Sequence, residues 1–124
     1  MKEMNKRARK AAGRYLELQG YGIVDKNWSD EAIAGKVDLV AEDGGTIVFV
    51  TVSVSGLDGD AGFREEPLSR EQAELLAATW LGAHPDAGVD VPVRFDRISV
   101  LVVGQDRAML RHTVNCLGLP GTTC

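Results

Sequence analysis

The sequence predicts an α/β fold in which helices flank a mixed β-sheet, in the order helix, three strands, helix and two strands. Three observations support this. Residues 4–19 have helical hydrophobic spacing, two β-rich runs flank Gly44-Gly45, and a helix-start signature at Ser69 precedes an apolar run at 95–103. With 124 residues, 44% of them hydrophobic, the chain is long enough to bury a core.

The first predicted helix covers residues 4–19. Its apolar residues recur at spacings of three and four, at Met4, Ala8, Ala11, Tyr15 and Leu18. Basic residues occupy the other side, and Gly20 follows the last apolar residue, as is typical of a helix C-terminus. We therefore expect an amphipathic helix that packs on a sheet and exposes a basic side.

A short strand in 21–28 precedes a β-hairpin in 36–54. Gly44-Gly45 suits a two-residue hairpin turn because glycine tolerates positive φ, and this turn pairs Asp43 with Thr46. Counting outward from the turn sets the register of both strands.

In this register Asp38 lies opposite Thr51, and Lys36 lies opposite Ser53. Because side chains alternate along a strand, these four polar residues share one face of the hairpin. The other face is expected to be apolar, with Val37, Leu39, Val50 and Val52.

The second helix is expected to begin near Ser69, which forms a capping-box pattern with Gln72. Residues 95–103 then predict a strand buried on both faces, and 108–114 a final short strand. We expect one domain over 1–117 and a peripheral C-terminal tail over 118–124.

Charge is unevenly distributed along the chain. The net charge is −4, but residues 1–14 hold six basic groups against Glu3, and the remaining 110 residues therefore carry −9. This asymmetry makes Lys6, Arg7, Lys10 and Arg14 candidate nucleic-acid-binding residues. The alternative is a solvated helix face on an acidic protein.

Neither membrane insertion nor secretion is expected. The sequence lacks an apolar run of the roughly 20 residues needed to span a bilayer, and its basic N-terminus is not followed by a signal-type apolar region. We therefore expect a cytoplasmic protein. Cys116 and Cys124 lack the spacing of a zinc site, so reduced thiols are expected, with Cys124 in a frayed end.

Four runs of the sequence resemble the YraN family of small bacterial proteins. They are 15–28 (YLELQGYGIVDKNW), 35–52 (GKVDLVAEDGGTIVFVTV), 94–100 (RFDRISV) and 111–117 (RHTVNCL). The resemblance extends from about residue 8 to residue 117. It implies a restriction-endonuclease-like sandwich of the PD-(D/E)xK superfamily, in αβββαββ order, and a link to DNA.

The family pattern resembles GEIDLIA followed by VFVEVK, with a glutamate in the first helix. The resemblance implies a site in which carboxylates hold Mg²⁺ and a lysine steadies charge on the phosphate. Asp38 matches the family's aspartate. The other site positions are substituted: Lys36, Thr51 and Arg9 replace glutamates, and Ser53 replaces the lysine.

These substitutions remove the net negative charge of the family pattern, so Asp38 beside an ammonium group is a poor magnesium site. The leading hypothesis is a catalytically degenerate, nuclease-like protein that acts as a nucleic-acid-binding module without a cofactor. Asp38 and Lys36 remain candidate catalytic residues, and Asp38 a candidate ligand for Mg²⁺ or Mn²⁺ if activity is retained. The 58–66 loop is the one evident source of a replacement acid.

Other readings of the sequence stay open. One is a protein-interaction or assembly module, as a homodimer or with another protein, and another is a DNA endonuclease with a rearranged site. Lys36 and Asp38 are equally well explained by a salt bridge on an exposed sheet face. His112 is expected to pack or form hydrogen bonds rather than act as a base.

Overall fold

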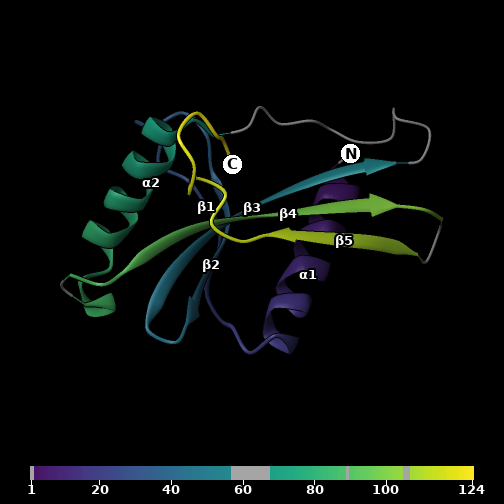
Figure 1. The fold of residues 1–124 in the computed structure, drawn as a ribbon, viewed down its shortest axis with the longest axis horizontal. Helices are drawn as coiled ribbons and strands as arrows, with labels where there is room; N and C mark the ends of the chain where they lie inside the picture. Colours follow the sequence, from purple (N-terminus) through teal and green to yellow (C-terminus); the bar gives the residue numbers. More distant parts are fainter. Residues whose placement is uncertain (1, 57–67, 89, 105–106) are drawn as a thin grey trace.

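The computed structural model describes residues 2–56, 68–88, 90–104 and 107–124. Its elements follow the predicted order (Figure 1). They are α1 (Lys2–Leu18), β1 (Gly22–Trp28), β2 (Val37–Asp43), β3 (Thr46–Gly56), α2 (Arg70–Ala83), a 3₁₀ turn at Pro85–Ala87, β4 (Val93–Val102) and β5 (Ala108–Thr113).

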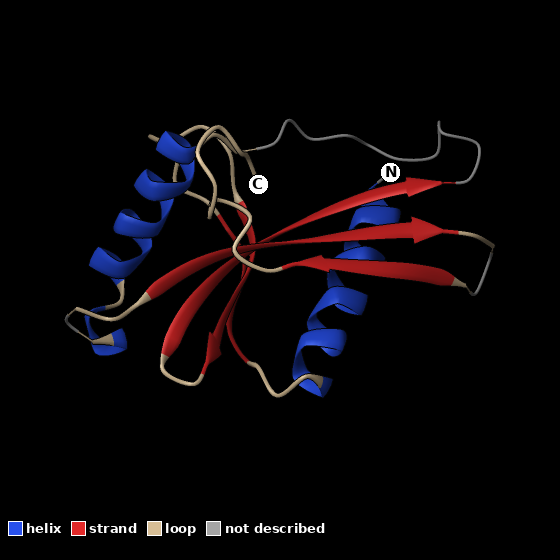
Figure 2. Cartoon of the chain, in the orientation of Figure 1, coloured by secondary structure: helices blue, strands red, loops and turns tan. Residues whose placement is uncertain are grey.

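The five strands form one sheet in the order β1-β2-β3-β4-β5. Neighbouring strands are antiparallel except β3 and β4, which are parallel and joined through α2. The two helices lie toward opposite ends of the sheet and pack on opposite faces of it (Figure 2). The predicted α/β fold with a mixed sheet is confirmed, and it is consistent with a restriction-endonuclease-like sandwich.

The hairpin register is confirmed near the turn. Gly44 and Gly45 have φ values of 56° and 91°, as the turn requires, and Asp43 pairs with Thr46. The predicted register continues as far as the pair Leu39↔Val50. Beyond that pair the two strands no longer follow it, which matters for the site described below.

The predicted start of the second helix is also confirmed. The Ser69 side chain accepts a hydrogen bond from the Gln72 backbone N–H at 3.2 Å, and the Gln72 side chain accepts one from the Ser69 N–H at 3.1 Å. This reciprocal cap satisfies two backbone donors that the first turn of a helix leaves unpaired.

The prediction of one apolar and one polar face on the hairpin is wrong. Leu39, Val48 and Val50 pack toward α1, whereas Val40 and Phe49 pack toward α2. Both faces are apolar because β2 and β3 lie inside the sheet, with a helix on each side. A strand buried on both faces loses the alternation that a one-sided hairpin shows.

The cysteines also differ from expectation. Cys116 and Cys124 form a disulfide, and Cys124 is 3% exposed, so the prediction of reduced thiols in a frayed end is wrong. The backbone of Cys124 exchanges two hydrogen bonds with that of Leu68, next to the start of α2. The chain end is thus fixed both to Cys116 and to the backbone just before α2, which the Cys spacing alone does not reveal.

The prediction that residues 95–103 are buried on both faces is wrong for one half of β4. α2 packs against this strand near Phe95. Farther along the same face, Arg97, Ser99 and Leu101 are only half-buried.

Candidate functional site

Asp38 lies where β2 and β3 stop pairing. The carboxylate is buried, with 4% of the residue exposed, and its Oδ2 accepts the backbone N–H of Val52 at 2.7 Å. The backbone pairing of β2 with β3 ends at the pair Leu39↔Val50, next to Asp38. The side chain of Asp38 therefore satisfies a donor that the regular ladder leaves unpaired there.

Two cations flank the other oxygen of this carboxylate. Asp38 Oδ1 lies 3.6 Å from Arg9 Nε and 3.7 Å from Lys36 Nζ. Arg9 comes from α1, and Lys36 directly precedes β2. The expected Lys36–Asp38 ion pair is thus present, but on a buried acid rather than on an exposed sheet face.

The other two substituted positions, Thr51 and Ser53, contact β4. Thr51 lies beside Arg97, and Ser53 beside Ser99, whose hydroxyl accepts a hydrogen bond from that of Ser53 at 3.2 Å. The Thr51 hydroxyl is buried and has no hydrogen-bond partner. Of the five site positions in the family pattern, the structure therefore brings three together around one carboxylate: Arg9, Lys36 and Asp38.

This set of donors does not fit a divalent cation. Mg²⁺ and Mn²⁺ favour oxygen ligands, and at least one carboxylate oxygen must be open to the ion. Here one oxygen accepts an N–H and the other faces two positive groups. Across the described residues no cluster of three His, Cys, Asp or Glu side chains could hold a metal; the acids of 58–66 lie outside these residues.

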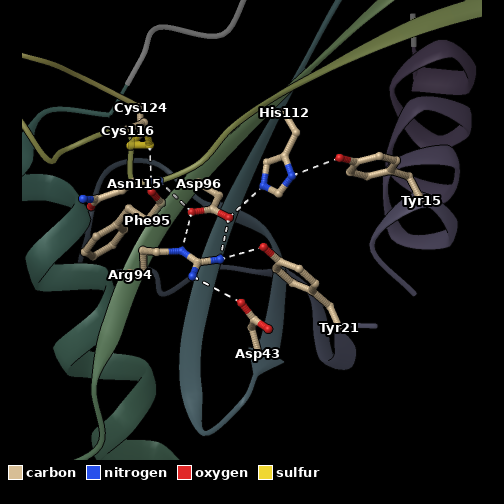
Figure 3. A network of polar contacts seen from close by, with 10 residues as sticks. All are labelled: Tyr15, Tyr21, Asp43, Arg94, Phe95, Asp96, His112, Asn115, Cys116 and Cys124. Carbon is tan, nitrogen blue, oxygen red and sulfur yellow. Dashed lines mark hydrogen bonds and ion pairs between the residues drawn. A yellow bond between two sulfur atoms is a disulfide. The ribbon is translucent and has the colours of Figure 1, made fainter. Parts of the chain in front are cut away.

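A second polar centre surrounds Asp96 on β4 (Figure 3). Asp96 is 0% exposed and accepts hydrogen bonds from Arg94 Nε at 2.9 Å and Nη2 at 3.1 Å. His112 Nε2 lies 2.8 Å away, and the Asn115 backbone N–H donates at 2.9 Å. Both oxygens are therefore saturated by donors, and neither faces solvent.

This network extends from β4 and β5 to α1, to the turn before β1 and to the end of β2. Arg94 Nη2 donates to the Tyr21 hydroxyl at 2.7 Å, and Nη1 donates to Asp43 Oδ2 at 3.3 Å. His112 Nδ1 lies 3.2 Å from the hydroxyl of Tyr15 on α1. The expectation that His112 forms hydrogen bonds is confirmed. A centre with its acceptors filled and buried stabilises the fold and offers no group to a substrate.

Protonation in this network follows its contacts. Burial disfavours the charged form of Asp96, but hydrogen bonds from Arg94, Asn115 and His112 outweigh it and hold the pKa of the carboxyl below its usual value. The hydrogen bond to Asp96 raises the pKa of Arg94. Burial raises the pKa of Tyr21. Asp96 is therefore a charged, paired carboxylate over the physiological range.

The sequence carried one signal for this centre. Arg94 and Asp96 are two residues apart in a strand, so they lie on the same face. On the face of β4 that holds them, the next residues are Ile98 and Val100, so the pair indicates a buried ion pair rather than a surface one. The partners from α1 and β5 lie far away in the sequence and could not be read from the strand itself.

The basic side of α1 is exposed as predicted. Lys6, Arg7, Lys10 and Arg14 are exposed, while Ala8, Ala12 and Leu16 of the same helix are buried against the sheet. Lys6, Lys10 and Arg14 follow one another at intervals of four residues, so they form one ridge along the helix. Arg7 lies next to this ridge, and we call Lys6, Arg7, Lys10 and Arg14 together the α1 basic ridge.

The fold is that of an α/β protein with a five-stranded mixed sheet between two helices. The chain belongs to uncharacterised protein family UPF0102, whose model matches residues 8–100. This is the YraN family that the motifs resemble, so that expectation is confirmed.

Its relatives are bacterial proteins. The chain is 39% identical over 101 residues to a UPF0102 protein of Beutenbergia cavernae, a match that covers 80% of each chain. It is 33% identical to one of Geobacter sulfurreducens, over 87% of this chain and 83% of the other. It is 32% identical to one of Geobacter metallireducens, over 95% of this chain and 94% of the other.

In the part of the chain that the structure describes, no helix combines the length and apolar character needed to cross a membrane.

Proposed function

We propose that this chain is a nuclease-fold protein that no longer carries out metal-dependent cleavage and that binds DNA through the α1 basic ridge. The observation that supports the loss of cleavage is the state of Asp38, whose carboxylate lies between Arg9 and Lys36. Because bacterial DNA lies in the cytoplasm, the proposal keeps the expected cytoplasmic location.

The charge around Asp38 argues against a bound divalent ion. An ion at this carboxylate would stand a few ångströms from two positive groups, and like charges repel strongly in a partly buried site. The ion would also have to compete for Oδ2 with the Val52 N–H. Asp38 serves here as the counter-ion of α1 and as a cap for β3.

The α1 basic ridge supports the binding half of the proposal. With a rise of 1.5 Å per residue, Lys6 and Arg14 lie about 12 Å apart along the helix axis, a length that spans several phosphates of a duplex. Glu17 is the one acid near this ridge among the described side chains of α1. The ridge is therefore a local positive surface on an otherwise acidic protein.

Salt dependence of DNA binding tests this proposal. Four phosphate contacts predict a slope of log K against log salt of about −3.6, so raising salt from about 50 to about 200 mM should weaken binding about 150-fold. Replacing Lys6, Lys10 and Arg14 by Gln should reduce the slope by about 2.7 units. Lys26→Gln removes the same kind of charge from β1 and should leave the slope unchanged. A wild-type protein that does not bind at low salt contradicts the proposal.

A cleavage assay tests the catalytic half. Linear and branched DNA are incubated with the protein in Mg²⁺ or Mn²⁺, beside the Asp38→Ala variant. We expect no cleavage by either protein. Cleavage by the wild type that disappears in the variant would show that Asp38 still holds a working metal site, as in the alternative of a rearranged endonuclease.

A further inference from the structure

Residues 116–124 are fastened to the fold at two places. At one end, the Cys116 backbone N–H donates a hydrogen bond to the Phe95 carbonyl of β4 at 2.7 Å. At the other end, the backbone of Cys124 exchanges two hydrogen bonds with that of Leu68, just before α2. The disulfide joins these two ends, and Figure 3 shows it beside Phe95. We call residues 116–124 the C-terminal clasp.

The two cysteines are held close together by contacts that do not involve sulfur. Their Cα atoms are 5.5 Å apart, within the range of about 4.4–6.8 Å that a disulfide needs. The backbone hydrogen bonds of Cys116 to Phe95 and of Cys124 to Leu68 fix this separation. The pair can therefore lose and re-form its bond without a rearrangement of the backbone.

The fold also has a place for the reduced form of Cys116. Its Sγ lies 3.2 Å from the Phe95 carbonyl oxygen, within hydrogen-bond reach for sulfur. A disulfide sulfur carries no hydrogen, so this contact becomes a hydrogen bond only when Cys116 is a thiol. The carbonyl has two lone pairs and can accept both the N–H and the S–H of the same residue. Both oxidation states of Cys116 therefore fit the same backbone.

The two cysteines differ in how firmly they are held. Both are buried, with Cys116 6% and Cys124 3% exposed, so a reductant does not reach the closed disulfide directly. Cys116 lies next to buried Leu117, whereas residues 118–123, which lead to Cys124, are mostly exposed. A segment with few buried contacts opens locally with a small free energy. Opening the two hydrogen bonds to Leu68 exposes Cys124 and leaves Cys116 in place.

We propose that the C-terminal clasp is a redox switch, closed by the Cys116–Cys124 disulfide and opened by a dithiol reductant. Disulfides in a reducing compartment are usually transient or redox-sensing. The inference takes the cytoplasmic location from the proposed function, but it does not involve DNA. In the open state the backbone before α2 is no longer tied, through Cys124, to the turn that holds Cys116.

Opening transfers two electrons from the dithiol to the protein. A thiolate of the reductant attacks Cys124 Sγ, the S–S bond breaks, and Cys116 leaves as a thiolate that takes up a proton. The second thiol of the reductant loses its proton and displaces Cys124, which becomes a thiol in turn, and the reductant is left as a disulfide. Closing reverses these steps with a low-molecular-weight disulfide, which accepts the two electrons and is released as two thiols.

The reactivity of the two thiols in the folded, reduced protein tests which end opens. After reduction and removal of the reductant, iodoacetamide is added and the alkylated fraction of each cysteine is followed by peptide mass spectrometry. Cys124 should react about tenfold faster than Cys116, because local opening exposes it. In protein unfolded by urea the two rates should be similar, which controls for intrinsic reactivity. Equal rates in the folded protein, or a faster Cys116, would overturn the proposal.

The rate at which the oxidised protein is reduced separates local opening from global unfolding, and it needs no folded reduced form. Arg70 at the start of α2 donates hydrogen bonds to the carbonyls of Leu117 and Leu119, so it holds the clasp in place. Dithiothreitol should therefore reduce Arg70→Ala about tenfold faster than the wild type. Arg107→Ala removes an exposed arginine outside the clasp and should keep the wild-type rate. Ile98→Val destabilises the whole fold from the α1 side and should also keep it.

The outcomes decide the proposal without any measurement on DNA. Faster reduction of Arg70→Ala alone supports a clasp that opens locally. If instead Ile98→Val is reduced faster, by about fivefold, and Arg70→Ala is not, the bond breaks only on global unfolding and is a fixed structural link. That result would overturn the redox switch. A protein that binds no DNA contradicts the proposed function and leaves both thiol measurements unchanged.

Discussion

Replacing Asp96 by Asn tests the buried ion pair at the centre of the β4 polar network. The change keeps the shape of the side chain but removes the charge that faces Arg94. It also replaces one acceptor oxygen by an NH2 group, which then faces either Arg94 Nη2 and His112 or Arg94 Nε and the Asn115 N–H. Removing one partner of a buried ion pair costs about 3–5 kcal/mol. Because the Arg94 side chain is 21% exposed and also contacts Asp43, we expect the lower end, about 3 kcal/mol.

This loss is measurable by urea unfolding and by thermal melting. For a chain of this length, about 3 kcal/mol corresponds to a fall in Tm of roughly 12 °C. Asp86→Asn, the same substitution at an exposed position, should change stability by less than about 0.5 kcal/mol. A loss below about 1 kcal/mol for Asp96→Asn would refute the argument that the carboxylate is charged and paired.

The pH dependence of the same variant gives an independent check. The folded pKa of Asp96 lies below its unfolded value of about 3.9, so its stabilising effect is complete above that pH and is lost as pH falls through the folded pKa. The difference in stability between wild type and Asp96→Asn should therefore be constant near neutrality and shrink below about pH 4. A difference that grows in acid would contradict the direction of the shift.

Two further substitutions have clear expectations. Asp38→Asn should destabilise the protein by about 1–2 kcal/mol in chemical unfolding, because Arg9 and Lys36 lose their shared counter-ion while remaining partly solvated; a more stable variant would instead indicate a strained metal site. Replacing Cys116 and Cys124 by Ser, or adding a dithiol reductant, should cost about 2.5 kcal/mol for a loop with a sequence separation of eight, read as a lower Tm. A Tm that does not respond to reductant would show that the two thiols are not joined in solution.

Local chemistry made several elements predictable. The Gly44-Gly45 turn fixes its own geometry and thereby the register of the pairs that follow, and the Ser69 cap depends only on residues three apart. The spacing of α1 likewise predicts that Ala8 and Tyr15 lie toward the sheet. The same prediction is wrong for Ala11 and Leu18, which are exposed, because the buried side of the helix runs through Ala12 and Leu16 instead. In each case the cause lies within a few residues of the effect, so the sequence contains it.

The site was less predictable because its contacts are long-range. Sequence spacing placed Asp38 on a polar, exposed face, whereas the end of the β2–β3 pairing turns its carboxylate to the Val52 N–H and to Arg9 of α1. Two partners of Asp96 come from β5 and from the turn that follows it, and the Cys116–Cys124 link depends on how the chain end folds back. Such contacts are set by packing, which hydrophobic periodicity does not encode.

The central claim, that Asp38 is a counter-ion and not a metal ligand, is tested most directly by titrating the ¹⁵N-labelled protein with Mn²⁺. Paramagnetic broadening reports an ion near the amides of Leu39 and Val52, which lie beside the carboxylate. The account predicts that these two signals keep their intensity at millimolar Mn²⁺, in wild type as in Asp38→Asn. Selective loss of both signals in the wild type, restored in Asp38→Asn, would contradict it.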